Sequence, residues 1–259
     1  MKKRIIGIDY LKCICIILVI FTHYSWSADE RSSLLFPFWV DLAIPVLMIT
    51  TGFNYYNSMK TKRWKMVKSF QRILLPFLIT IFIEFIPLMV IDNFSIVSTL
   101  KKLIGGGYGP GSYYTIIMIQ IILTYPFLYK IINKSKYGWI IPVFIHLLFE
   151  LFVSIVQMSP ALYRLLFFRY IVFLVIGSLI AIKYENREHS IDKLKLGILF
   201  IVGSFIVYML SYTNIKTFLF NNWRTTSMPV SVLALFYFLS FLGMKLKENK
   251  MIELISKAS

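Results

Sequence analysis

The fold is decided by a pattern that first appears in residues 1–26, MKKRIIGIDYLKCICIILVIFTHYSW, where a basic cluster precedes an apolar run of helical length. A run of about 20 apolar residues is long enough to cross the hydrocarbon core of a bilayer as an α-helix. Lipid offers backbone groups no hydrogen-bonding partners, so a spanning segment must be a helix or part of a closed barrel, and barrel strands are much shorter. The sequence therefore predicts a membrane-spanning helix from Ile8 to Trp26.

Seven more apolar runs of the same kind follow, which gives about eight predicted spans. They are Pro37–Tyr56, Ile73–Ile91, Ser112–Tyr129, Tyr137–Val156, Leu165–Ile182, Leu194–Tyr212 and Met228–Met244. Hydrophobic residues make up 58% of the 259 residues, well above the roughly 45–50% of soluble domains. We expect an all-α, polytopic transmembrane bundle that forms one membrane domain over residues 1–259, with residues 245–259 as a cytoplasmic or interfacial tail.

The charge balance is strongly basic, with 28 Lys and Arg against 12 Asp and Glu and a net charge of +16. The predicted connections on one side of the membrane, together with both ends of the chain, hold 21 of these basic residues, and the other side holds seven. Basic residues concentrate on the cytoplasmic side of membrane proteins. We therefore predict that both termini are cytoplasmic, that the protein lies in the cell membrane, and that nucleic acid is not a partner. Lys12, residues 57–72, Lys134 and Glu248 should face the cytoplasm, whereas Arg31, Lys101 and Thr213 should face outward.

Several ionisable residues interrupt the apolar runs. Such groups cost about 2.5–3.5 kcal/mol each at a helix centre, so they are candidates for function. Counting about 1.5 Å of rise per residue places five of them at similar heights in the outer half of the membrane. These five are His23, Asp41, Glu84, Glu150 and Arg169. The alternative, open above all for Glu84 and Glu150, is that the groups only pair inside the bundle and fix helix packing.

His23 is the strongest catalytic candidate. A neutral imidazole accepts a proton near physiological pH and can therefore activate a hydroxyl. Lys12 precedes it by eleven residues, or three helical turns, so both should lie on one face with Lys12 at the cytoplasmic end. An ordinary basic anchor explains Lys12 equally well. His146, one turn before Glu150, is better explained as a structural partner of that carboxylate.

Four blocks in the first half of the chain resemble the membrane acyltransferase 3 family, in the family's order. They are Asp9–Lys12 with Phe21–His23, Val40–Leu42 with Thr51–Phe53, Lys68–Arg72 with Pro76, and Gly111–Tyr114 with Tyr125–Phe127. The resemblance implies an enzyme of many membrane helices that moves acyl groups from cytoplasmic acyl-CoA to hydroxyls of extracytoplasmic glycans. It implies His23 as the base and Lys12 as its basic partner.

Three positions depart from the family's usual pattern. Lys12 stands where Arg is usual, Ser69 where a second Arg is common, and Tyr114 where Trp is usual. Lysine lacks the planar two-pronged guanidinium, so any contact from Lys12 to a phosphate would be that of a point charge.

Donor binding is assigned to the basic segment before the third predicted span. Its cations suit the phosphates of the coenzyme, and Arg72 abuts the apolar run. Anchoring and contact with anionic lipid explain residues 60–65 equally well. Lys68, Arg72 and Tyr114 are the predicted donor-binding residues.

The preferred interpretation is an O-acyltransferase that takes an acyl group, and we favour acetyl, from acyl-CoA without a metal. The acceptor is a cell-surface polysaccharide or a similar hydroxyl compound, and the predicted catalytic residues are His23, Lys12, Asp41 and Glu150. A proton-coupled transporter of a glycan or small solute remains open, because a layer of carboxylates, His and Arg suits that function too. The oligomeric state stays open.

The last nine residues, 251–259, read MIELISKAS. They resemble the amphipathic segment that leads into a final hydrophobic helix in the same family. We therefore expect a shortened family member in which Met251, Ile252, Leu254 and Ile255 lie at the membrane surface without a partner helix. An inactive remnant is the third interpretation.

Overall fold

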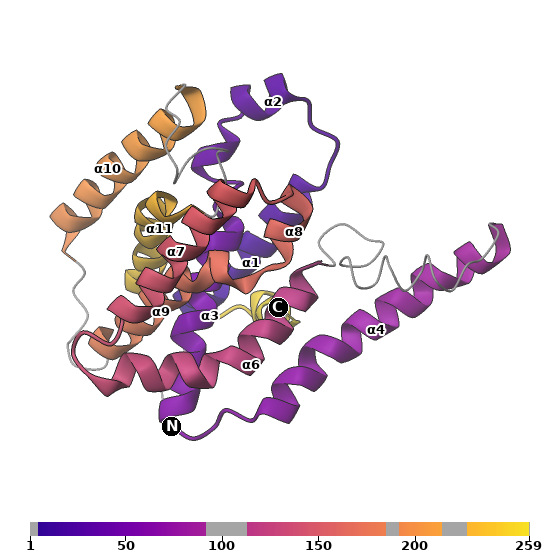
Figure 1. The fold of residues 1–259 in the computed structure, drawn as a ribbon, viewed down its shortest axis with the longest axis horizontal. Helices are drawn as coiled ribbons and strands as arrows, with labels where there is room; N and C mark the ends of the chain where they lie inside the picture. Colours follow the sequence, from indigo (N-terminus) through magenta and orange to yellow (C-terminus); the bar gives the residue numbers. More distant parts are fainter. Residues whose placement is uncertain (1–4, 92–112, 185–191, 214–226, 259) are drawn as a thin grey trace. The chain divides into compact units, whose positions relative to one another are not determined.

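The computed structural model describes residues 5–91, 113–184, 192–213 and 227–258, with the backbone alone for residues 84–91 and 257–258. Every regular element in these ranges is a helix, so the all-α prediction is confirmed (Figure 1). The α-helices are α1 (Ile6–Thr22), α2 (Ala28–Ser33), α3 (Ala43–Lys60), α4 (Met66–Ile91), α6 (Tyr113–Lys134), α7 (Ile140–Val156), α8 (Pro160–Leu165), α9 (Ile171–Tyr184), α10 (Lys193–Tyr212), α11 (Ser231–Gly243) and α12 (Lys250–Ala258). Three short 3-10 helices are η1 (Phe36–Phe38), η2 (Phe167–Tyr170) and η3 (Met228–Val230).

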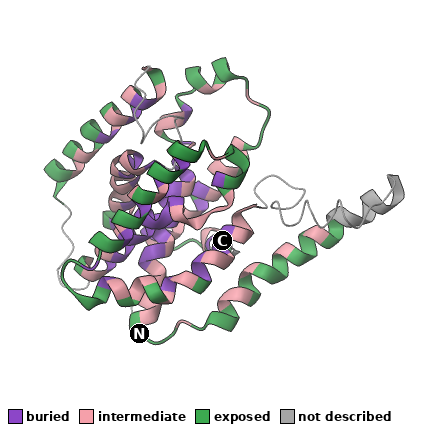
Figure 2. Ribbon diagram, viewed as in Figure 1, coloured by how far each residue is buried: buried purple, intermediate pink, exposed green. Residues whose placement is uncertain are grey.

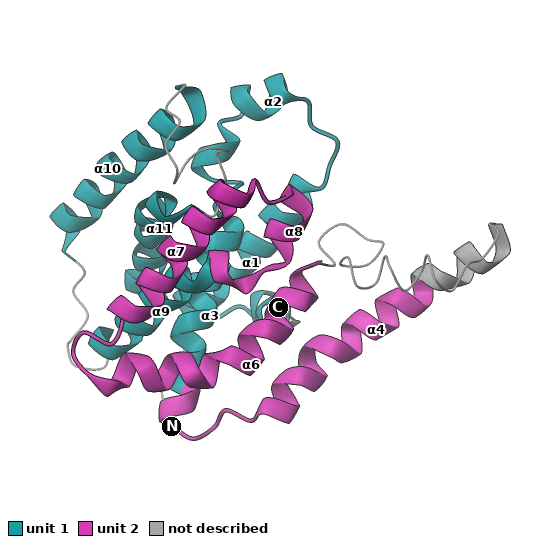
Figure 3. Ribbon diagram, in the orientation of Figure 1, with its two compact units in different colours: residues 1–57, 170–259 teal, residues 58–169 magenta. Residues whose placement is uncertain are grey.

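The chain forms two compact units, drawn in different colours in Figure 3. Unit 1 combines residues 1–57 with residues 170–259, and unit 2 comprises residues 58–169. Unit 1 therefore brings the first helices of the chain together with the last ones.

Each of the eight predicted apolar runs contains a helix. Among the described residues, five helical segments are long and apolar enough to cross a membrane, namely Phe36–Lys60, Met66–Ile83, Tyr113–Lys134, Phe167–Tyr184 and Lys193–Tyr212. Two further apolar helices, α7 and α11, are shorter. The first predicted span overlaps α1, which has 17 residues, begins two residues before the span and carries Asp9 in its first turn. The total number of spans and the side on which the ends lie stay predictions.

Large apolar side chains on α4 and α10 are exposed along much of these helices (Figure 2). Phe82 of α4 is 68% exposed, and Ile201 of α10 is 69% exposed. A helix that is apolar all round needs an apolar environment on every side. These exposed faces are therefore suited to lipid.

Glycines bring the helices of unit 1 into close contact. A Cβ added at Gly52 of α3 would lie 2.2 Å from the Leu174 carbonyl oxygen of α9, and one added at Gly177 of α9 would lie 2.0 Å from the Ile49 carbonyl oxygen of α3. Small residues of this kind allow close backbone approach between membrane helices. The Gly-Phe pair at residues 52–53 therefore has a packing role.

Three of the predicted spans begin with a 3-10 turn before the α-helix. In η1 and η3 a proline occupies one of the first helical positions, where its missing N–H costs no hydrogen bond. Between η1 and α3, residues 39–42 leave the helical path, and Asp41 lies in this break. The short helix α2 lies outside the predicted spans, and α8 ends at Leu165, the first residue of the sixth span. Each begins with a serine side chain that caps its first turn.

Candidate functional site

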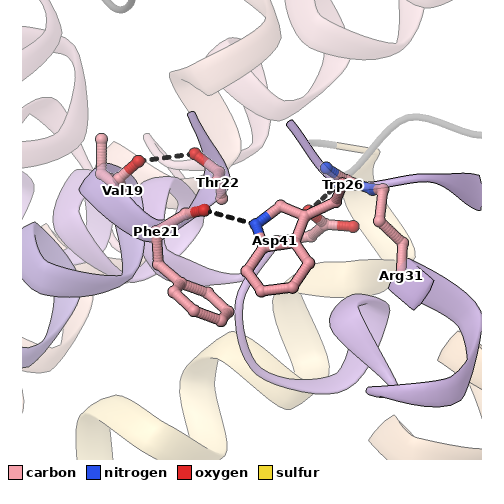
Figure 4. A network of polar contacts seen from close by, with 6 residues as sticks. All are labelled: Val19, Phe21, Thr22, Trp26, Arg31 and Asp41. Carbon is pink, nitrogen blue, oxygen red and sulfur yellow. Dashed lines mark hydrogen bonds and ion pairs between the residues drawn. The ribbon is translucent and has the colours of Figure 1, made fainter. Parts of the chain in front are cut away.

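The first helix ends earlier than predicted, and this changes the place of His23. α1 stops at Thr22, and His23 is its C-cap residue, with its backbone N–H bonded to the Ile20 carbonyl at 3.1 Å. The Trp26 indole donates to the Phe21 carbonyl at 2.7 Å, which satisfies a backbone acceptor at the end of the helix (Figure 4). The His23 side chain is exposed rather than enclosed within a longer helix. It is therefore accessible to a substrate.

Aromatic rings surround this end of α1. The Phe21 ring lies 4.6 Å from Trp26, 5.6 Å from Phe36 and 6.1 Å from Trp39, measured between ring centroids. The Trp39 indole also donates to the Leu34 carbonyl at 2.8 Å. Both tryptophans thus combine ring packing with a hydrogen bond to the backbone, which fixes the turn after His23.

Asp41 has an ionic partner that the sequence did not identify. Its Oδ1 accepts a hydrogen bond from the Arg31 guanidinium at 2.7 Å, as Figure 4 shows. The side chain of Asp41 is 11% exposed and that of Arg31 is 37% exposed, and the guanidinium also lies 4.8 Å from the centre of the Phe36 ring. Arg31 was predicted only as an outward-facing residue. The pair ties α2 to the break before α3.

Lys12 lies in the other half of α1 and contacts the C-terminal part of the chain. Its Nζ donates to the Ser256 carbonyl at 2.6 Å, and the Ser256 hydroxyl donates to Asp9 Oδ1 at 2.6 Å. α12 therefore packs on α1 inside unit 1. The expectation that residues 251–255 lack a partner helix is wrong, because polar groups near the end of α12 bond to a helix at the other end of the chain. Met251 and Leu254 remain exposed on α12.

Unit 2 contains a buried polar cluster around Tyr163. The Tyr163 hydroxyl donates to Glu150 Oε1 at 2.7 Å, and the Arg169 guanidinium lies 4.8 Å from the centre of the Tyr163 ring. Glu150 and Arg169 are each 7% exposed, and Tyr163 is 1% exposed. Glu150 and Arg169, two of the five predicted ionisable groups, thus both contact Tyr163, a residue that the sequence analysis missed.

His146 bonds to a different partner from the one predicted. Its Nδ1 lies 3.0 Å from the Phe168 carbonyl oxygen, and its fully buried Nε2 has no hydrogen-bond partner among the described residues. Glu150 instead accepts from Tyr163. No hydrogen bond joins His146 to Glu150 among the described residues, but both side chains are buried on α7, and the burial of His146 and its contact with the Phe168 carbonyl agree with a structural role.

The segment after α8 is fixed by a side chain of α6. Gln120 donates through Nε2 to the Leu165 carbonyl at 2.7 Å and accepts through Oε1 from the Phe167 N–H at 3.3 Å. This amide replaces the helical bonds that are lost between α8 and η2. It thereby holds the chain on both sides of Leu166.

The predicted donor-binding residues lie on two helices of unit 2. Lys68 and Arg72 are exposed near the start of α4, and Tyr114 is half-buried in the first turn of α6. Because these two helices run in opposite directions, their starts point to opposite ends of the pair (Figure 1). The geometry therefore supports Lys68 and Arg72 as one group and separates Tyr114 from them.

Several sequence predictions fall outside the described part of the chain. They concern the side chain of Glu84, Lys101 and the glycine-rich residues 105–111. The single polar layer across five helices also stays a prediction, because its members belong to both units. Within the described residues, no group of three or more His, Cys, Asp and Glu residues is arranged to hold a metal ion.

Comparison with known proteins gives one match. A family model described as an acyltransferase domain matches residues 5–259. No curated protein and no solved structure matches the chain. The family match spans both units and includes all the predicted site residues, so the chain belongs to the membrane acyltransferase 3 family.

Proposed function

We propose that the protein is a membrane O-acyltransferase that moves an acetyl group from acetyl-CoA at the cytoplasmic face to a hydroxyl of a cell-surface polysaccharide or a similar acceptor. The observation that carries the proposal is the separation of two polar residues on α1. His23 is exposed at one end, and Lys12 lies eleven residues earlier, about 16.5 Å along the axis. Because of this distance, the two residues serve different parts of the reaction.

The proposed chemistry begins with His23 as general base. The imidazole takes the proton of the acceptor hydroxyl, whose oxygen attacks the thioester carbonyl carbon. The carbon–sulfur bond then breaks, the ester remains on the acceptor, and the departing thiolate takes up a proton to give free coenzyme A. The last carbonyl groups of α1 carry partial negative charge, which stabilises the positive imidazolium while it holds the proton.

Donor binding is assigned to cations at the predicted cytoplasmic side. Lys68 and Arg72 of unit 2 suit the phosphates of the coenzyme, since ammonium and guanidinium groups form charge-assisted hydrogen bonds with phosphate oxygens. Lys12 of unit 1 is proposed separately as a phosphate contact on the same chemical ground. Arg72 offers a planar two-pronged donor, whereas the two lysines act as point charges. The acyl group reaches His23 either on the extended coenzyme arm or by a relay, and the proposal requires only that it reaches the outer end of α1.

The proposed transfer is tested with membrane vesicles whose cytoplasmic face is outward. Acetyl-CoA labelled in the acetyl group is added outside, and label in glycan esters is measured. We expect label to appear only in vesicles that contain the protein. If the label stays in acetyl-CoA and no labelled ester forms, the proposed function is overturned.

The predicted topology has its own test. Single cysteines are placed at Ser58 and Arg31 in a chain whose Cys13 and Cys15 are replaced by alanine, and intact cells are treated with an impermeant thiol reagent. We expect labelling of the cysteine from Arg31→Cys and protection of the cysteine from Ser58→Cys. The opposite result would place His23 on the cytoplasmic side.

A carrier is the second candidate, favoured by the buried Glu150, Arg169 and His146 of unit 2. Buried ionisable groups inside a membrane bundle are typical of proton-coupled transport. Surface glycan from cells with and without the protein separates the two functions. A transferase changes the acetyl content per sugar, whereas a carrier changes the amount of glycan and leaves that content constant.

A further inference from the structure

Ser256 bridges two charged side chains of α1 that are almost one helical turn apart. Its hydroxyl donates to Asp9 Oδ1 at 2.6 Å, and its backbone carbonyl accepts from Lys12 Nζ at 2.6 Å. Ser256 is only 2% exposed. A buried serine in the last turns of a helix thus makes polar contacts through both its side chain and its backbone.

α12 is held so that this end of the helix meets α1. At its start, the Asn249 side chain accepts from the Met251 N–H at 2.9 Å, which caps the first turn. Before it, the Tyr10 hydroxyl donates to the Lys247 carbonyl at 3.1 Å. At its end, the Lys12 ammonium meets a carbonyl of the last turn, where a positive charge is favoured by the helix dipole.

We propose that Ser256 and Asp9 are positioning residues that hold the Lys12 ammonium in place for the anionic donor. The proposal rests on the proposed function, in which Lys12 contacts a phosphate of acetyl-CoA. A lysine ammonium sits on a flexible four-carbon stem and loses conformational freedom when it binds. Because the Ser256 carbonyl fixes the ammonium before the donor binds, the free enzyme has already lost part of this conformational freedom.

Removing the Ser256 hydroxyl tests this arrangement, because Ser256→Ala keeps the backbone carbonyl and removes the hydroxyl that donates to Asp9. We expect the KM for acetyl-CoA to rise about fivefold to tenfold, the size of effect expected for one charge-assisted hydrogen bond, with kcat within about twofold of wild type. Ser256→Thr keeps a hydroxyl and should retain most of the donor affinity. Ser240→Ala is the matched control and should leave the KM unchanged, since the Ser240 hydroxyl donates to the Phe236 carbonyl within its own helix, α11.

A double-mutant cycle separates positioning from general stability. If Ser256 acts through Lys12, Ser256→Ala should change the KM no further in a Lys12→Ala chain. An equal rise in KM in both backgrounds, or an unchanged KM in Ser256→Ala alone, would overturn the proposal.

A disulfide tests the contact without any activity. In the full chain with Cys13 and Cys15 replaced by alanine, Asp9→Cys and Ser256→Cys together should form an intramolecular disulfide under mild oxidation, whereas Asp9→Cys with Ser240→Cys should not. A missing disulfide overturns the positioning contact. If the disulfide forms but the wild-type protein transfers no acetyl group, the contact stands and the proposed function is rejected.

Discussion

Two histidines of this chain occupy opposite environments, and the contrast favours the proposed chemical role of His23 and a structural role of His146. His23 of unit 1 is exposed where α1 ends, beside aromatic rings and a turn fixed by indole hydrogen bonds. His146 of unit 2 is fully buried and bonds to the Phe168 carbonyl. A base must reach the proton that it removes. Of these two side chains, His23 is the one whose exposure meets this condition.

The same contrast extends to the neighbouring residues. The polar side chains on α1 lie toward its two ends, whereas Glu150, Tyr163 and Arg169 of unit 2 contact one another in the interior. Buried polar groups stabilise a fold when their hydrogen bonds are made and destabilise it when one partner is lost. We therefore expect substitutions on α1 to affect activity and substitutions around Tyr163 to affect stability.

The largest effect is expected from His23→Ala. Loss of a general base lowers the rate about 10²-fold to 10⁴-fold, and an exposed side chain contributes little to folding. Acetyl transfer measured at matched protein amounts should be nearly abolished while the thermal midpoint stays within a few degrees of wild type. Wild-type activity in His23→Ala would remove His23 from the chemistry.

Arg72→Ala should produce the next largest effect, because it removes the charge-assisted contact to phosphate that the proposed function assigns to Arg72, and donor binding should weaken. We expect a KM for acetyl-CoA about tenfold higher and little change in kcat. Lys65→Ala, in the exposed segment before α4, should leave the KM unchanged. If the two variants behave alike, Arg72 is an anchor rather than a donor ligand.

In unit 2, Tyr163→Phe should reduce stability and spare the catalytic chemistry. The variant leaves the buried Glu150 carboxylate without its hydroxyl donor, a loss of about 1–3 kcal/mol. Thermal unfolding in detergent should show a clearly lower midpoint, whereas kcat per folded molecule should stay close to wild type. Tyr24→Phe is the control on an exposed tyrosine. Loss of kcat with an unchanged midpoint would place Tyr163 in the reaction instead.

Sequence reasoning found the helices well because their signal is long and local. Each apolar run of about 20 residues identifies itself without knowledge of its neighbours. The ends of the helices were harder to predict. Nothing in the run from Ile8 to Trp26 shows that α1 stops at Thr22, because the end depends on the Trp26 indole folding back onto the Phe21 carbonyl.

The hydrogen-bond partners of the candidate site residues could not be predicted from the sequence either. Asp41 bonds to Arg31, Glu150 to Tyr163, and Lys12 to a residue 244 positions later in the chain. Helical spacing reveals only neighbours within one helix, and none of these pairs shares a helix. The Ser-Pro start of α8 was the one local signal near Tyr163, since serine caps and proline suits the first turn.

The smallest effect is expected from the short helix that follows His23. The Ser27 side chain and backbone both bond to Glu30 in a capping box, and these hydrogen bonds lower the pKa of the Glu30 carboxyl. Because the pKa is lowered, these hydrogen bonds stabilise α2 fully above the ordinary pKa of glutamate. This stabilisation is lost as the pH falls through the lower pKa of the folded state. Hydrogen exchange of residues 28–33 should therefore accelerate, relative to the intrinsic rate, as acid protonates Glu30. Glu30→Gln keeps a capping side chain without the charge and should remove this pH dependence, while Asp29→Asn should preserve it. An equal pH dependence in Glu30→Gln and wild type would show that the turn beside His23 is held by Arg31, Asp41 and the aromatic rings alone.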